Sequence, residues 1–139
     1  MAKPTPDDFR FKLELAVRDY ELDLLGMVNN SVYQSYLEHA RHEFLKEIGI
    51  DFAGMFKEGY RLVVVRSELD YRQTLHSGDR FLVCVRLERD SKVRFRFHQA
   101  IFRLPDLTLA IEAQILGTCL KETGRPCFPP GWESLVEPL

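Results

Sequence analysis

Residues 17–45 read VRDYELDLLGMVNNSVYQSYLEHARHEFL, and this stretch decides how the rest of the chain is interpreted. It places an acidic residue and a turn glycine, Asp23 and Gly26, directly before a strong helical pattern. The Asn-Asn-Ser run at 29–31 supplies the small polar side chains that cap the free N–H groups of a helix start. The same N–H groups can hold an oxyanion. The stretch therefore predicts a carboxylate aimed at a helix N-terminus.

A long helix is predicted from Ser31 to Ile48, because apolar residues recur there at four-residue steps. Ser31 with Gln34 three positions later satisfies a capping-box pattern, and Gly49 stands where a left-handed helix end is expected. A short second helix over 51–58 follows.

Five strands are predicted from alternating apolar residues, the first over 9–17 and the others over 61–75, 80–90, 93–104 and 107–122. Short turns between the last four favour an antiparallel meander, covered on its apolar face by the long helix. The expected fold class is α+β, an antiparallel sheet wrapped around one long central helix. A single domain over 1–139 is expected, with a flexible leader at 1–8 and a proline-rich tail at 124–139 whose Trp132 and Leu135 dock onto the body.

The composition argues against several classes of protein. A length of 139 residues with 45% hydrophobic residues suits one compact core. The net charge of -2 provides no overall attraction to nucleic acid or to an anionic membrane. Neither a membrane span nor a signal peptide is apparent, so we expect a cytoplasmic protein, or a plastid stromal one if this is a processed plant chain. Three cysteines without CxxC spacing, and histidines that do not form HExxH, predict neither a disulfide framework nor a metal site.

With these elements in place, the chain resembles the hotdog-fold thioesterases of the 4-hydroxybenzoyl-CoA thioesterase family. The likeness rests on Asp23, Gly26, Tyr33 and the helix segment from Glu38 to Arg41. Within the family it is most similar to plant acyl-lipid and methylketone-synthase-type acyl-ACP thioesterases and their bacterial relatives, which hydrolyse fatty or 3-oxo-fatty acyl thioesters. The enediyne-pathway branch has Asn at the place of Asp23 and keeps an Arg at that of Arg41. The acid present here favours an acid-dependent mechanism.

The resemblance implies a catalytic set of Asp23, Asn30 and Arg41. Asp23 would act on water as a general base, which we prefer, or attack the thioester as a nucleophile. A backbone N–H near Asn29 or Asn30 would stabilise the oxyanion, and Arg41 would orient the acyl carbonyl or the pantetheine arm. Each residue has a structural alternative: a turn-forming Asp23, capping asparagines, and an exposed Arg41 or one paired with Glu38.

A wider set of residues is expected to contact the substrate, although the apolar ones would also serve an ordinary core. The set is Gly26, Val28, Asn29, Tyr33, Phe44, Val65 and Ser67. Strand arginines are candidates for the phosphates of CoA or phosphopantetheine, with a solvated sheet face as the alternative; these are Arg66, Arg72, Arg80, Arg94 and Arg96. No cofactor is expected beyond the CoA or phosphopantetheine of the substrate.

The expected partners are acyl-CoA or acyl carrier protein and a second copy of the chain. An exposed sheet edge favours pairing into a homodimer or homotetramer, with active sites at the subunit interface. Two alternatives remain open at this point: an aromatic acyl-CoA thioesterase of the same fold, and a non-catalytic acyl-binding module. The sequence is compatible with acyl groups of different lengths, with CoA or acyl carrier protein as the thiol carrier, and with a dimer or a tetramer.

Overall fold

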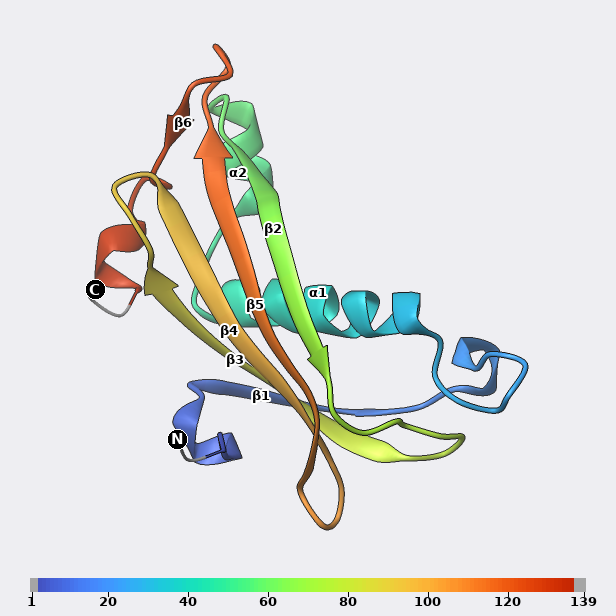
Figure 1. The fold of residues 1–139 in the computed structure, drawn as a ribbon. Helices are drawn as coiled ribbons and strands as arrows, with labels where there is room; N and C mark the ends of the chain where they lie inside the picture. Colours follow the sequence, from blue (N-terminus) through green and yellow to red (C-terminus); the bar gives the residue numbers. More distant parts are fainter. Residues whose placement is uncertain (1–2, 137–139) are drawn as a thin grey trace.

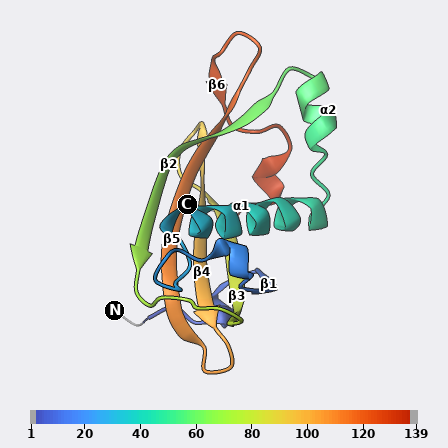
Figure 2. The ribbon, with the colours of Figure 1, turned by 90° about the vertical axis from the view of Figure 1, so that its right-hand side faces the viewer.

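The computed structural model describes residues 3–136 (Figure 1). Within them the strands are β1 (Phe11–Ala16), β2 (Arg61–Tyr71), β3 (Arg80–Arg89), β4 (Arg94–Arg103), β5 (Thr108–Leu120) and β6 (Pro126–Cys127). The helices are α1 (Asn30–Glu47) and α2 (Phe52–Lys57), with single 3-10 turns at Pro6–Asp8, Asp19–Glu21 and Trp132–Ser134. One long helix therefore lies across one face of a strongly curved sheet, as Figures 1 and 2 show. The predicted α+β hotdog fold is confirmed.

The strand order is β1-β3-β4-β5-β2, with β6 paired to the end of β5 and every pair antiparallel. The expected four-strand meander is wrong in one respect: β3, β4 and β5 follow one another, but β2 lies at the far edge beside β5. Residues 72–79 connect β2, at the edge of the sheet, to β3, which lies beyond β5 and β4. This connection, called the 72–79 crossing below, replaces the expected tight turn. Its first two amides, of Arg72 and Gln73, donate to the Ala110 carbonyl, and Leu75 is fully buried.

The helix start also differs from the expectation by one residue. Asn29 is the N-cap, and its side-chain oxygen accepts a hydrogen bond from the Ser31 amide at 3.0 Å. The Ser31 hydroxyl donates to the same oxygen, so the predicted Ser31–Gln34 capping box does not form. The helix ends as expected before Gly49, which has a φ of +89°.

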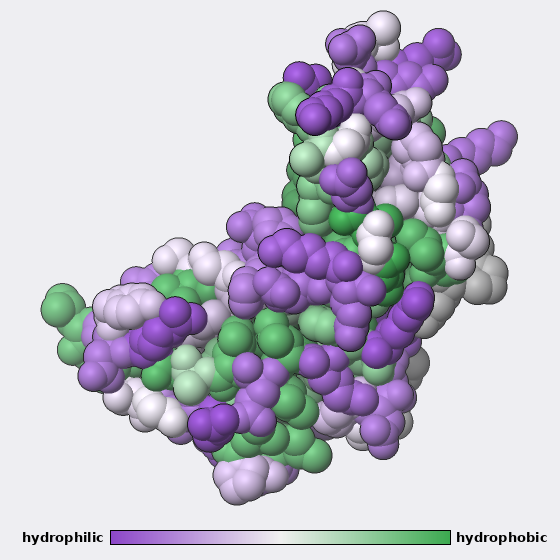
Figure 3. Space-filling model, turned by 180° about the vertical axis from the view of Figure 1, so that it is seen from behind, coloured by the Kyte–Doolittle hydropathy of each residue, from purple (hydrophilic) through white to green (hydrophobic). Residues whose placement is uncertain are grey.

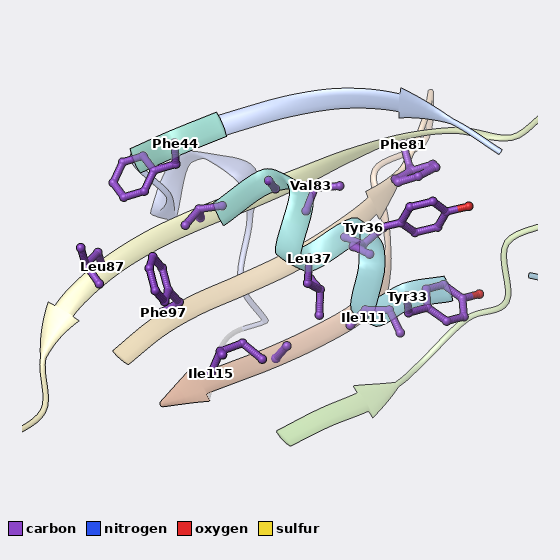
Figure 4. Packing of buried hydrophobic residues seen from close by; sticks show 14 of the residues in the cluster. Tyr33, Tyr36, Leu37, Phe44, Phe81, Val83, Leu87, Phe97, Ile111 and Ile115 are labelled. Atoms are coloured by element: carbon purple, nitrogen blue, oxygen red, sulfur yellow. The ribbon is translucent and has the colours of Figure 1, made fainter. Parts of the chain in front are cut away.

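The core lies between α1 and the concave face of the sheet, and Figure 4 shows both sides meeting. From the helix come Tyr33, Tyr36, Leu37 and Phe44, all buried. They meet inward-facing residues of β3, β4 and β5, among them Phe81, Val83, Phe97, Ile111 and Ile115. Because buried side chains recur at three- and four-residue steps along α1, the start of the helix is held at a fixed place against the sheet.

The two ends of the chain add smaller pieces. In the expected leader, Pro6–Asp8 form a 3-10 turn and residues 1–2 lie outside the described part. In the expected tail, Trp132 is fully buried and Leu135 packs against the core, while residues 137–139 lie outside the described part. No helix within residues 3–136 is long and apolar enough to cross a membrane.

Candidate active site

A tight loop between the first strand and α1 carries Asp23. The Asp23 amide donates to the Met27 carbonyl at 2.7 Å, and the Gly26 amide donates to the Asp23 carbonyl at 3.1 Å. Gly26 has a φ of +80°, a conformation that residues with a side chain rarely adopt. The turn therefore depends on the glycine and returns the chain directly to the helix start.

The two carboxylate oxygens of Asp23 have different surroundings. Oδ1 accepts hydrogen bonds from the amides of Leu25 at 2.8 Å and Met27 at 3.1 Å, which is the turn-forming role considered from the sequence. Oδ2 accepts no hydrogen bond from any residue between 3 and 136. The structural role and a chemical role can thus use separate oxygens of one carboxylate.

Asp23 lies in the wall of an open cleft of about 610 Å³. The loop and the helix start contribute Asp23, Met27, Val28, Asn30 and Tyr33, and the opposite wall contributes Tyr71, Arg72, Gln73, Thr74, His76 and Arg103. The cleft thus has one carboxylate on the loop side and two guanidinium groups on the other. Such a site suits a substrate with a reacting carbonyl and a negatively charged arm.

The first turn of α1 leaves one backbone donor free, on a residue that lines this cleft. The Ser31 amide is taken by the Asn29 side chain, and the Val32 amide by the Asn29 carbonyl at 2.9 Å. The Asn30 amide donates to no acceptor in the described chain. Capping and oxyanion binding therefore need not compete, because they use different N–H groups at the positive end of the helix dipole.

A buried carboxylate that the sequence analysis missed holds the Asp23 loop against the helix. The Glu21 side chain accepts hydrogen bonds from the Tyr36 hydroxyl and the Arg18 amide, both at 2.8 Å, and the Glu21 carbonyl accepts from the Asn29 amide. Burial and the bond to Glu21 raise the pKa of Tyr36 well above its ordinary value. Nothing in the sequence marks Glu21 as buried, because acidic residues beside turns are usually exposed.

Tyr33 reaches the cleft from the first turn of the helix. Its hydroxyl accepts a hydrogen bond from the Leu75 amide at 3.1 Å, which ties the 72–79 crossing to α1. Burial raises the pKa of Tyr33, partly offset by the hydrogen bond from Leu75. The hydroxyl therefore keeps its proton at neutral pH and can donate it in a hydrogen bond.

Arg41 lies outside this cleft. It is eleven residues beyond Asn30, which corresponds to roughly 16 Å along the helix axis. It is neither exposed nor ion-paired with Glu38: only 7% of the residue is accessible, and Nη1 donates to Gln99 Oε1 at 3.0 Å. Its guanidinium carbon lies 5.8 Å from the centre of the Phe97 ring. Burial lowers the pKa of Arg41, an effect that Glu38 opposes.

A second cavity, of about 340 Å³, contains Arg41 in its wall. It lies between α1, α2, β2 and the C-terminal segment, where Figure 3 shows apolar surface on the helix side of the molecule. Ser67 lines a shallower groove that also touches Arg41. Val65 is exposed on β2, and Phe44 lies in the core against Phe11, in the wall of neither cavity.

Among the candidate phosphate-binding arginines, Arg72 is the one in the cleft wall, and its guanidinium also lies 3.9 Å from Asp70 and 3.8 Å from Glu112. Arg66 pairs with Glu68, Arg80 with Glu14 and Arg96 with Asp90, and Arg94 is exposed. Arg103, which the sequence analysis did not single out, joins Arg72 in the cleft because β4 ends there, and it donates a hydrogen bond to Asp106 at 2.9 Å. No three His, Cys, Asp or Glu side chains within residues 3–136 are grouped so that they could hold a metal ion.

Comparison with known proteins agrees with this architecture. The model of the thioesterase-like superfamily matches residues 17–136, from the Asp23 loop to the docked tail. The chain belongs to that superfamily. A chloroplastic acyl-acyl carrier protein thioesterase of Arabidopsis thaliana, ATL3, is 40% identical over 115 residues, which are 83% of this chain and 60% of the plant protein. This chain thus spans less than two thirds of that relative.

Solved structures carry the same fold. A 1,4-dihydroxy-2-naphthoyl-CoA thioesterase from Synechocystis superposes with a TM-score of 0.83 at 22% identity, covering 91% of this chain and 94% of that one. A thioesterase from Thermus thermophilus, solved with coenzyme A and zinc, has a TM-score of 0.74 at 29% identity, covering 88% of this chain and 93% of that one. The predicted family resemblance is confirmed.

Proposed function

We propose that this protein hydrolyses acyl thioesters, with fatty or 3-oxo-fatty acyl groups on acyl carrier protein or CoA as substrates. The observation that carries the proposal is the unbonded Oδ2 of Asp23 in a cleft that Asn30, with its free amide, also lines. Membership of the thioesterase-like superfamily and the 40% identity to a plant acyl-ACP thioesterase support the same chemistry. The coenzyme A held by the Thermus relative supports a thioester carrier of this kind.

In the proposed reaction Asp23 acts as a general base. Oδ2 takes a proton from a water molecule while the water oxygen bonds to the thioester carbon, and the carbonyl electron pair moves onto its oxygen. The Asn30 amide donates to that oxyanion at the positive end of α1. When the carbonyl re-forms, the carbon–sulfur bond breaks with its electron pair on sulfur, and the thiolate receives the proton from Asp23.

We infer that Arg41 of one protomer contributes to the active site formed around Asp23 of a second protomer. Strand β2 is a sheet edge of eleven residues, paired on one side with β5 and carrying the exposed apolar side chains of Val64 and Val65. Edges of this kind are prone to pair. Antiparallel pairing of two β2 edges about a two-fold axis near mid-strand would set Tyr71 of one protomer near Arg61 of the other. Each Asp23 cleft would then face the Arg41 cavity of its neighbour.

The Asp23→Asn variant tests the chemistry, because it keeps the shape and Oδ1 of the side chain but lacks the base. We expect hydrolysis of decanoyl and 3-oxodecanoyl thioesters, followed as released thiol, to fall at least about a hundred-fold while the melting temperature stays close to that of the parent. Full activity of this variant would refute the assignment of Asp23. A preference for benzoyl-CoA in the parent would instead identify an aromatic acyl-CoA thioesterase.

Mixing two variants tests the shared site, which also predicts that Arg41→Gln alone loses most of the activity. Asp23→Asn and Arg41→Gln subunits that exchange freely should recover about a quarter of the parent activity, since half the dimers are mixed and each has one intact site. A site contained in one chain would give no recovery.

A further inference from the structure

The cavity beside Arg41 is polar where it adjoins a neighbouring groove, and its remaining walls are apolar except for His42. Glu38, Arg41 and Val64 line both this cavity and the shallower groove that leads along β2. They therefore mark where the two spaces join. The remaining walls, among them Phe95 and Trp132, belong to the cavity alone. A guanidinium near the junction of the two spaces and aromatic rings beyond it suit a linear acyl chain whose thioester end lies near Arg41.

The aromatic wall combines the sheet with the C-terminal segment. The rings of Phe95, on β4, and Trp132 lie 4.9 Å apart at an angle of 49°, and both residues are buried. The indole Nε1 has no hydrogen-bond acceptor in the described chain. Ring packing therefore holds Trp132 in place, so this wall can be altered without breaking a polar network.

Gly117 determines where the Phe95 ring can lie. The two residues face each other across β4 and β5. A Cβ atom at position 117 would lie 2.5 Å from Cε1 of Phe95 and 2.9 Å from the Val63 carbonyl oxygen, both too close for real contacts. Any side chain there would therefore displace the Phe95 ring, which lines the cavity, or push against the backbone of β2 at Val63.

We propose that Phe95 and Trp132, seated over the bare Gly117, form the end wall that sets the length of the acyl chain this cavity accepts. The proposal rests on the proposed thioesterase function. It assigns chain-length selection to a residue of the C-terminal segment and to a glycine, neither of which touches the Asp23 cleft.

A binding experiment tests the wall without any hydrolysis. Trp132 is the single tryptophan of the chain, so its emission reports directly on contact with the wall. In a series of free fatty acids from hexanoic to hexadecanoic acid, we expect the emission to change only once the chain is long enough to reach the rings. If a fatty acid displaces a fluorescent fatty-acid probe at saturation and no member of the series alters the tryptophan emission, the wall is elsewhere.

Variants then test length selection. Trp132→Ala should shift both the preferred fatty acid in probe displacement and the preferred acyl thioester toward longer chains, and Gly117→Ala should shift them toward shorter ones. Trp132→Phe and Phe95→Leu give milder versions should the larger changes prevent folding. Phe128→Leu is the matched control, because Phe128 is a buried residue of the same segment outside the cavity.

The outcomes separate the two proposals. If folded variants of Phe95 and Trp132 keep the acyl-chain-length preference of the parent, the proposed end wall is refuted. This holds whether or not the parent hydrolyses thioesters. Selective binding of fatty acids by a parent that hydrolyses none of their thioesters would overturn the proposed function and leave the wall standing. A shift in Phe128→Leu equal to that in Trp132→Ala would show that loosening the segment, and not the wall, controls length.

Discussion

The hydrogen bond between Tyr36 and Glu21 should hold the Asp23 loop in place, and Tyr36→Phe removes it alone. The Tyr36 ring packs against Phe81 with centroids 4.7 Å apart, and that packing is kept in the variant. Loss of a hydrogen bond to a buried carboxylate costs about 1.5–3 kcal/mol. For a domain of this size that corresponds to a decrease in melting temperature of roughly 5–10 °C.

Because Glu21 also accepts the Asn29 amide through its carbonyl, the loop should become less well positioned. We expect kcat to fall roughly ten-fold or more with a smaller change in KM, since displacement of a catalytic group acts mainly on the chemical step. Thermal unfolding and thiol release measure the two effects. Tyr20→Phe is the matched control: it removes an exposed hydroxyl that accepts from Arg18 at 2.8 Å, and it should change stability by less than about 0.5 kcal/mol.

A double-mutant cycle with Glu21→Gln isolates the pair. The coupling free energy between the two positions should be about 1 kcal/mol or more. A coupling below roughly 0.5 kcal/mol, or a Tyr36→Phe enzyme with parental kcat, would refute the positioning role.

Five further outcomes are expected. Asn29→Ala removes the cap and should lower the free energy of unfolding by about 1 kcal/mol in urea denaturation, with Asn29→Ser close to the parent. Gly26→Ala meets no atom within 4 Å but has a φ of +80°, so it should cost about 1–2 kcal/mol of backbone strain, and Gly26→Asn should cost less. Val65→Lys on the exposed edge should halve the mass measured by light scattering, whereas an unchanged mass would place the subunit contact elsewhere. Burial raises the pKa of Cys84 from 9.0 to about 12, so at pH 8 it should resist a disulfide reagent that labels the partly exposed Cys127. The pKa of Cys84 is higher in the folded than in the unfolded protein, so the contribution of the neutral thiol to the free energy of unfolding is fully present below pH 9. Above pH 9 the free energy of unfolding should decrease, by at most about 1.4 kcal/mol per pH unit. Denaturation at pH 8 and pH 10 would detect this decrease.

Local patterns in the sequence are sufficient for the elements and for part of the site. The four-residue apolar repeat predicts α1 because only a helix places those residues on one face, and the glycines at 26 and 49 mark turns because few other residues adopt positive φ. Asp23 beside a helix start is likewise visible, since the residues that form the turn and the cap are close in sequence.

The partners of those residues were decided by tertiary structure. Strand β2 pairs with β5 because the 72–79 crossing is anchored by Leu75 under Tyr33, and alternation within a strand does not specify its neighbour. The burial of Glu21 and Arg41 is equally invisible in the sequence, as it depends on side chains contributed by distant segments. The amino-acid sequence alone therefore determined which backbone conformation each segment prefers. Long-range packing decided which charged side chains are buried and which cavities they line.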